Sequence, residues 1–252
     1  MSDEVEGKLV ITGPDAPTVY DAVAVLDAAG GCRVAHRAVE ELSDAYFDGP
    51  ERQLFALGLA LRVRSLNGRE LLTVKGESRV QDGVITRDEL EVAWSPEGLD
   101  EVLETLSQAG VWLRDVEAAR EATTARAAME ALGFVGGVAR DNRRIALTLA
   151  RGGEAVAELD VDAVTMTVDG TVIRHYEVEC EAKGGGDAGV VRAVLADLGS
   201  RHPGLRPWSV SKLALGEAVE ALASEGRLAP LLDGERLRPE AYDAVEAMAG
   251  RL

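Results

Sequence analysis

The sequence predicts an α+β fold in which an antiparallel sheet closes on itself and turns its charged side chains inward. Many segments alternate charged and apolar residues with a period of two, Asn-Gly and Asp-Gly turns join several of them, and helical patterns separate two groups of strands. Successive side chains of a strand point to opposite faces, so each of these strands has one charged and one apolar face. Helices are expected to cover the apolar faces.

The first half of the chain is predicted to form a strand, a helix and then further strands. Residues 4–11 alternate charged and apolar side chains, which predicts the first strand. A helix is expected over residues 18–29, because Pro17 precedes this segment and two glycines follow it. Asn67-Gly68 is typical of a hairpin turn. Further strands are predicted at residues 33–40, 43–48, 57–65, 70–75 and 84–94.

The second half starts with helices and then returns to strands. Apolar residues recur at helical spacing in residues 96–109, and residues 118–132 are rich in alanine, so both segments are predicted helices. Glycine pairs and an Asp-Gly turn then separate strands expected at residues 143–150, 155–161, 166–169 and 171–182. The remaining segments predict a helix at residues 190–198, a short strand at 211–216 and two short helices within 217–252.

We expect one large domain over residues 1–216 and a C-terminal helical extension over residues 217–252. No low-complexity tract or linker divides the 252 residues.

The charge balance excludes some classes of partner. The formal net charge is -17, from 44 acidic and 27 basic residues, and such a surface repels nucleic acid and anionic membranes. No apolar run approaches the ~20 residues that a membrane-spanning helix needs. The first residues lack the pattern of a signal peptide, and Cys32 and Cys180 form no metal-type cluster. These features predict a cytoplasmic protein.

The charged faces of the strands are sorted by sign. A solvated sheet face is the ordinary reason for charged alternation, but such a face usually mixes acids and bases within one strand. Here some strands are rich in acids and others in bases. The acid-rich strands carry Glu4 and Glu6, Glu89 and Glu91, and Glu177, Glu179 and Glu181, whereas the base-rich strands carry Arg62 and Arg64, Lys75, and Arg143 and Arg144.

Repeated Glu-x-Glu pairs point to bound cations. Two carboxylates on one strand face lie about 7 Å apart and repel each other unless a cation lies between them. Ligation by oxygen alone suits Mg²⁺ or Mn²⁺. Guanidinium and ammonium groups on neighbouring strands suit phosphate oxygens. The charged faces therefore predict a site for a phosphate compound bound together with divalent metal ions.

The segment Glu4-Val5-Glu6-Gly7-Lys8 resembles the Glu-x-Glu-x-Lys strand of the CYTH domain, or triphosphate tunnel metalloenzyme, superfamily. Further similar motifs follow in the order of the family and extend the resemblance to about residues 1–216. They are Tyr46-Phe47-Asp48, Leu61-Arg62-Val63-Arg64, Thr73-Val74-Lys75-Gly76, Arg87-Asp88-Glu89-Leu90-Glu91, Gly133-Phe134, Arg143-Arg144, Leu159-Asp160-Val161-Asp162, Glu177-Val178-Glu179-Cys180-Glu181 and Ser209-Val210-Ser211-Lys212.

The resemblance implies a tunnel of eight antiparallel strands with helices outside, and it implies roles for individual residues. Phosphate would be held by Lys8, Arg62, Arg64, Lys75, Arg143 or Arg144, and Lys212. The metal ligands would come from Glu4, Glu6, Asp162, Glu177, Glu179 and Glu181, with two of the last three facing the tunnel. Glu4, Glu6, Lys8 and Lys75 would be the catalytic residues.

The function that this resemblance implies is a Mg²⁺- or Mn²⁺-dependent hydrolase of a triphosphate. Inorganic triphosphate is the favoured substrate, because no extra surface for a large organic leaving group is evident. The alternatives are a class IV adenylyl cyclase, a thiamine or nucleoside triphosphatase, and a polyphosphate-binding module without catalysis. A small-molecule triphosphate is the expected partner, and a homodimer is left open.

Overall fold

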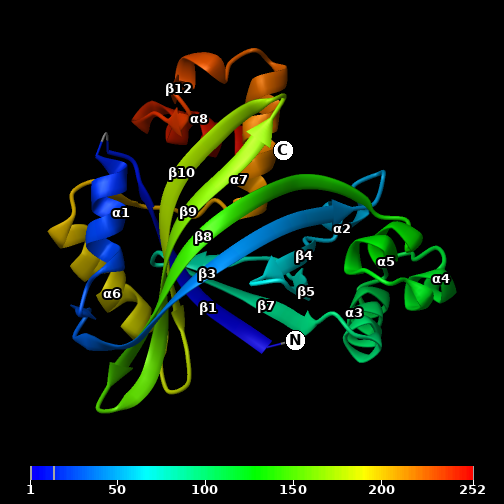
Figure 1. The fold of residues 1–252 in the computed structure, drawn as a ribbon, viewed down its shortest axis with the longest axis horizontal. Helices are drawn as coiled ribbons and strands as arrows, with labels where there is room; N and C mark the ends of the chain where they lie inside the picture. Colours follow the sequence, from blue (N-terminus) through cyan, green and yellow to red (C-terminus); the bar gives the residue numbers. More distant parts are fainter. Residues whose placement is uncertain (1, 14, 252) are drawn as a thin grey trace. The chain divides into compact units, whose positions relative to one another are not determined.

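The computed structural model describes residues 2–13 and 15–251 (Figure 1). Its helices are α1 (Ala16–Ala24), α2 (Gln53–Ala56), α3 (Pro96–Gln108), α4 (Val116–Glu121), α5 (Ala125–Ala131), α6 (Ala188–Arg201), α7 (Lys212–Ser224) and α8 (Pro239–Ala249), with a 3-10 turn at Ala229–Leu231. Its strands are β1 (Ser2–Ile11), β2 (Ala28–Ala29), β3 (Cys32–Asp48), β4 (Ala60–Leu66), β5 (Arg69–Lys75), β6 (Arg79–Gln81), β7 (Val84–Ala93), β8 (Val135–Arg151), β9 (Glu154–Val168), β10 (Thr171–Ala182), β11 (Leu205–Pro207), β12 (Leu232–Asp233) and β13 (Arg236–Leu237).

Eight of the strands form a closed hydrogen-bonded ring. Their order is β1-β7-β5-β4-β3-β8-β9-β10, and β10 also pairs with β1. The pairings of β1 with β10, β9 with β10, β3 with β4, β4 with β5 and β5 with β7 are all antiparallel. A parallel pairing joins β10 to the short β13 outside the ring. The predicted α+β fold with a closed eight-stranded antiparallel sheet is confirmed.

The chain divides into two compact units. The first contains residues 1–3, 41–78 and 87–140, and the second contains residues 4–40, 79–86 and 141–252. In the first unit, the apolar faces of β4 and β5 pack against α3 and α5. Leu61 and Leu72, for example, are buried in one cluster with Leu99 and Met129. The opposite faces of β4 and β5 are thereby left to the charged side chains.

The second unit has two apolar clusters. In one of them, α1 and α6 pack against β1, β8, β9 and β10, with Tyr20 and Val194 fully or nearly buried. In the other, α7 and α8 pack against β9 and β10 together with Trp208. Residues 217–252 belong to this second cluster and to the second unit. A domain boundary at residue 216 stays a prediction.

Several predicted element boundaries were wrong, and local hydrogen bonds explain two of them. The predicted helix over 118–132 is two helices, because Asp115 and Thr124 each cap a separate one by accepting a hydrogen bond from a backbone N–H. The segment 211–216 is not a strand. Ser211 caps α7 there, accepting a hydrogen bond from the backbone N–H of Ala214 at 3.1 Å.

The helix predicted over residues 18–29 ends early. It stops at Ala24, and Ala28 and Ala29 pair with Arg33 and Cys32 as β2. Among the described residues, none of the helices has both the length and the apolar character required to cross a lipid bilayer.

Candidate functional site

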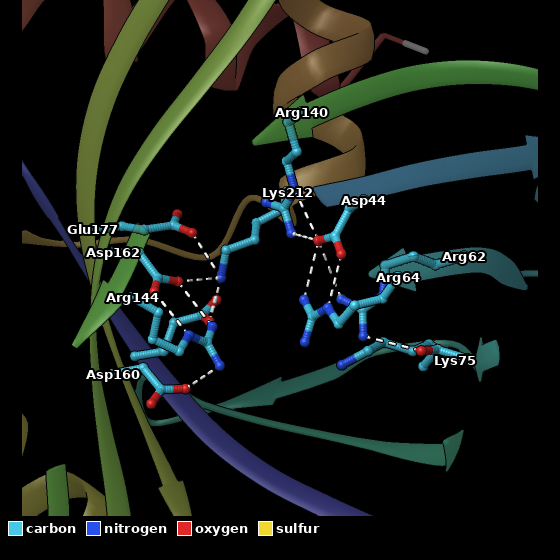
Figure 2. A network of polar contacts seen from close by, with 12 residues as sticks. Asp44, Arg62, Arg64, Lys75, Arg140, Arg144, Asp160, Asp162, Glu177 and Lys212 are labelled. Carbon is cyan, nitrogen blue, oxygen red and sulfur yellow. Dashed lines mark hydrogen bonds and ion pairs between the residues drawn. The ribbon is translucent and has the colours of Figure 1, made fainter. Parts of the chain in front are cut away.

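Charged side chains gather in two buried clusters, one in each unit (Figure 2). The carboxylate cluster, in the second unit, consists of Lys8, Arg144, Asp160, Asp162, Glu177, Glu179 and Lys212. The arginine cluster, in the first unit, consists of Asp44, Arg62, Arg64 and Arg140. Each is described on its own below.

Strand register builds the carboxylate cluster. Glu179 lies opposite Lys8 on β1 and opposite Asp160 on β9, while Glu177 lies opposite Asp162. Directly opposed residues of antiparallel strands share a face of the sheet, so these side chains all project from the same side. The period-two alternation of three strands thus places one base and four acids next to each other.

Two further cations come from other elements. The Arg144 guanidinium, on β8, forms a bidentate pair with Asp162, with Nε–Oδ1 and Nη2–Oδ2 distances of 2.8 and 2.9 Å, and also contacts Glu179 and Asp160. Lys212 stands at the first position of α7. Its Nζ lies 3.1 Å from Asp162 Oδ2 and 2.7 Å from Glu177 Oε1, and it also contacts Glu179. The cluster therefore sets four carboxylates against three cationic side chains.

Three of the carboxylates are arranged as a metal site requires. Ligand oxygens of Asp162, Glu177 and Glu179 all lie within 4.8 Å of one another. Hard divalent cations such as Mg²⁺ and Mn²⁺ prefer oxygen ligands of this type. The donor set therefore fits such an ion, and the ammonium group of Lys212, which contacts all three acids, already supplies a positive charge there.

The three acids are held in their ionised forms. Burial alone would raise their pKa values, but Arg144 and Lys212 lower the pKa of Asp162. Lys212 and Lys8 overcome the effect of burial at Glu177 and Glu179 and lower the pKa of each. Asp160 differs: burial raises its pKa, and although Arg144 opposes this, the negative charge of Asp162 adds to the rise. Carboxylates must be deprotonated to bind a metal, so the set with lowered pKa values is the competent one.

The arginine cluster is organised around one acid. Asp44 on β3 is 2% exposed and lies opposite Arg64 on β4. Its Oδ1 accepts a hydrogen bond from Arg64 Nε at 2.7 Å, and its Oδ2 accepts bonds from Arg64 Nη2 at 3.0 Å and Arg140 Nη2 at 2.5 Å. Arg62 Nη1 lies 3.7 Å from the same Oδ2. One carboxylate thus orients three guanidinium groups (Figure 2).

The charges of this cluster are strongly coupled. Burial would raise the pKa of Asp44, but the charge of Arg62, the hydrogen bonds from Arg64 and the charge of Arg140 together hold it well below its usual range. Burial would lower the pKa of Arg62, whereas Asp44 raises it. Three guanidinium groups face this carboxylate and Glu91 pairs with one of them, so the cluster keeps a net positive charge, which suits an anion with several negative oxygens.

A row of polar side chains continues the charged face across β5 and β7. Arg62 lies opposite Thr73, which lies opposite Glu91. Arg62 Nη2 donates to Thr73 Oγ1 at 3.1 Å and to Glu91 Oε2 at 3.0 Å. In the next row, Lys75 Nζ lies 3.1 Å from Glu89 Oε1. Lys75 is thus on the same face as Arg62, with an acid beside it.

The alternatives that the sequence left open differ in their surroundings. Arg144 is buried in the carboxylate cluster, whereas Arg143 is exposed and donates a 3.4 Å hydrogen bond to the hydroxyl of Tyr20. Glu177 and Glu179 join the metal-compatible set, whereas Glu181 lies 2.5 Å from Lys183 Nζ.

Glu4 and Glu6 are both buried on β1, and Glu6 lies opposite Glu181 across the pairing of β1 with β10. Neither belongs to the metal-compatible set that the described residues form. Their roles as ligands and catalytic groups stay predictions.

The sequence reasoning did not select Asp44, Arg140 or Asp160. A signal for Arg140 exists: Arg140, Asn142 and Arg144 are buried, and their neighbours Asp141 and Arg143 are exposed. Extending the alternation of this strand backwards from Arg144 would have found it. Asp44 offers no such signal, because only the register of β3 against β4 brings it to Arg64.

Comparisons with known proteins concern the family and the fold of the chain. The family model described as the CYTH domain matches residues 2–194. HpAC1 of Hippeastrum, a proposed adenylyl cyclase that reveals a dominant triphosphatase activity, is 21% identical, with 90% of this chain and 98% of that chain covered and a TM-score of 0.55. A proposed adenylate cyclase from Bacillus halodurans is 13% identical, with 84% and 97% covered and a TM-score of 0.53. No curated protein sequence matches the chain significantly.

Proposed function

Because this chain belongs to the CYTH domain family, we propose that it is a metal-dependent hydrolase that cleaves a phosphoanhydride bond of a triphosphate, with inorganic triphosphate as its substrate. The observation that carries this proposal is the set of ionised carboxylates of Asp162, Glu177 and Glu179, whose oxygens lie within 4.8 Å of one another. Three converging carboxylates with lowered pKa values are the ligands that a divalent cation needs.

Asp162, Glu177 and Glu179 would hold Mg²⁺ or Mn²⁺. Such an ion, when bound, neutralises negative charge on phosphate oxygens and so favours hydrolysis. Lys8 and Lys212 would contribute fixed positive charge, because both ammonium groups contact Glu177 and Glu179. A carboxylate of this cluster would accept the proton of the attacking water.

The arginine cluster would bind phosphate groups. Asp44 holds Arg64 and Arg140 in fixed orientations, so little side-chain entropy would be lost when a phosphate accepts their hydrogen bonds. Arg62 and Lys75 lie on the same charged face and would also bind phosphate oxygens.

Two arguments bear on the class of substrate. The dominant triphosphatase activity of HpAC1 supports hydrolysis, although the likeness to that protein concerns the fold. The same neighbour and the Bacillus halodurans protein are proposed cyclases, which favours adenylyl cyclase as the second candidate. We further propose a cytoplasmic location without nucleic-acid or membrane partners, which the net charge of -17 supports.

A substrate screen tests the proposal. The purified protein is incubated with inorganic triphosphate, ATP or thiamine triphosphate, each with Mg²⁺, Mn²⁺ or a chelator, and the products are followed by ³¹P NMR. We expect phosphate and pyrophosphate from inorganic triphosphate only when a metal is present. Release of pyrophosphate and cyclic AMP from ATP would establish the cyclase instead, and intact substrates throughout would indicate a binding module.

A matched pair of variants tests the metal ligands. Glu179→Gln removes one of the three converging carboxylates, whereas Glu181→Gln changes the next residue on the same face of β10, which pairs with Lys183. Glu179→Gln is expected to lower turnover at least a hundredfold and to raise the Mn²⁺ concentration required for half-maximal rate. Glu181→Gln should lose less than threefold, and equal losses in the two variants would refute this ligand set.

A further inference from the structure

Within the part of the chain that the structure describes, a pocket in the second unit shares no lining residue with either charged cluster. It has a cavity volume of about 70 Å³ and is open to solvent, and its lining residues come from β10, from the chain around the start of α1, and from the segment between β12 and the start of α8. No residue of the carboxylate cluster is among the described residues that line it. The proposed function does not use this pocket.

The charge of the pocket is opposite to that of the whole protein. Arg174, Arg236 and Arg238 line it, and Asp233 is the acid among its described lining residues. Arg174 and Arg236 are register partners in the parallel pairing of β10 with β13, so their backbones are adjacent. Three arginines therefore line one pocket in a chain whose net charge is -17. An isolated concentration of arginines in an acidic protein suits a small anion.

The existing partners of these arginines can be exchanged for a ligand. Arg174 Nε lies 3.2 Å from Glu235 Oε2, and both side chains are about half exposed. Arg236 Nη2 lies 3.3 Å from Asp233 Oδ2, and the aspartate side chain is 68% exposed. Exposed ion pairs of this kind are weak, so a multiply charged anion can replace the carboxylates at little cost.

Two features of the pocket favour the binding of an oxyanion. Arg238 Nε donates a 2.8 Å hydrogen bond to the carbonyl oxygen of Leu232, which fixes the guanidinium plane. Arg238 is also the N-cap residue of the 11-residue helix α8, and its side chain makes no capping hydrogen bond. The N-terminus of α8 adds a favourable potential for negative charge at the pocket wall, which the carboxylate of Glu240 in the first turn partly offsets.

The rest of the wall is mostly apolar or aromatic and also includes the buried His175. Tyr176 and Tyr242 line the pocket together with Leu237 and Pro239. Tyr242 also packs edge-on against Trp208, with ring centroids 5.5 Å apart, so this side of the pocket is rigidly supported. Such a surface can contact an organic group that is attached to the anion and extends from the pocket into solvent.

We propose that this pocket binds the phosphate group of a small molecule, held by Arg174, Arg236 and Arg238. The phosphate can arrive as the free ion or as part of a phosphomonoester. This inference is independent of the proposed triphosphatase activity, because it concerns binding at residues outside both clusters.

NMR of the arginine Nε–H groups tests the proposal in the full-length protein without divalent metal. The signals of Arg174 and Arg238 are assigned through their absence in Arg174→Gln and Arg238→Gln, and the protein is titrated with sodium phosphate or with AMP. We expect saturable shifts of both signals. In Arg174→Gln, the ligand concentration at which the Arg238 signal is half shifted should rise at least tenfold over that of the wild type. In the control Arg227→Gln, whose arginine pairs with Glu225, this concentration should equal that of the wild type.

The two titrations identify the source of the phosphate. Saturation by phosphate at the lower concentration indicates the free ion, and saturation by AMP at the lower concentration indicates a phosphomonoester. The proposal is overturned if neither ligand moves the signals more than sodium chloride at equal ionic strength, or if Arg174→Gln binds as the wild type does. Arg64→Ala should leave the titration unchanged, which separates this pocket from the arginine cluster.

Discussion

At the residue scale, most of the charged side chains of the two clusters are tied to one another, so their individual roles depend on their partners. Asp44 shows this most clearly. It is almost fully buried, and three arginines depend on it for neutralisation. Removing it would leave three guanidinium groups close together without their common acid, which is far more costly than removing an exposed charge.

Asp44→Asn is therefore expected to lower the free energy of unfolding at pH 7 by about 3–5 kcal/mol. The folded-state pKa of Asp44 is depressed, so its contribution is fully present above the ordinary carboxyl pKa of about 4 and is lost as the pH falls below that value. Urea denaturation at pH 7 and at pH 3 measures the free energy of unfolding of the wild type and of the variant. The difference between wild type and variant should shrink at pH 3, and an equal difference at both pH values would contradict the account.

The two adjacent arginines of β8 allow a second test at this scale. Arg144 contacts three acids of the carboxylate cluster, whereas Arg143 is exposed. Arg144→Ala should reduce the turnover of inorganic triphosphate at least a hundredfold, because it leaves Asp162 without its bidentate partner. Arg143→Ala should retain more than half of the wild-type rate. Steady-state kinetics of both variants measures the two turnover rates. A larger loss of turnover in Arg143→Ala than in Arg144→Ala would show that Arg143, and not Arg144, belongs to the site.

At the element scale, the helices hold the strands that carry the clusters. The turn before β3 packs tightly against α6. Gly30 has a positive φ of 58°, its N–H donates to Asp197 Oδ2 at 2.8 Å, and a Cβ at this position would lie 2.6 Å from the backbone nitrogen of Val194. Only glycine fits such a close approach. Gly31 has a φ of 77°, but a Cβ there would meet nothing within 4 Å.

Gly30→Ala and Gly31→Ala form a matched pair, because both place alanine in the left-handed region. Gly31→Ala should lower the free energy of unfolding by about 1–2 kcal/mol, because of backbone strain alone. Gly30→Ala should lower the free energy of unfolding by a further ~1–3 kcal/mol, because α6 must move away from the turn. Chemical denaturation of the two variants gives the difference. Equal losses would show that the packing of this turn against α6 is looser than the structure indicates.

At the scale of the whole molecule, the chain combines a net charge of -17 with buried arginines and lysines in two clusters. Burying many charges is expensive unless each is compensated, and here protein side chains provide the compensation before any ligand binds. A ligand that binds only the folded state must therefore increase stability by mass action.

Inorganic triphosphate with Mg²⁺ is expected to raise the melting temperature by about 5–10 °C at a hundredfold excess over its dissociation constant. That excess adds about 2.7 kcal/mol to the free energy of unfolding. The melting temperature of a protein of this size rises by about 2–4 °C for each kcal/mol. Differential scanning fluorimetry measures the shift, with sodium sulfate of equal ionic strength as the control. An unchanged melting temperature at saturating ligand would argue against a triphosphate site.

The sequence alone determined the type of fold and most of the charged residues of the clusters. Period-two alternation identifies the charged faces of Arg62 and Arg64, and of Glu177 and Glu179, because the pleat of a strand is a local property. Motifs in the order of the family predict the closed sheet. The first turn of the helix at 212–224 was predicted as a strand, because a single capping serine at position 211 is a weak local signal.

Tertiary structure alone decided which of these residues meet. The register of β10 between β1 and β9 selects Glu177 and Glu179 for the carboxylate cluster, and the register of β3 against β4 brings Asp44 to Arg64. A shift of one residue would turn every side chain of a strand to the other face, and nothing within a single strand specifies the register of its neighbour. The clusters are therefore a consequence of long-range pairing, whereas the charged faces from which they are built are already present in each strand.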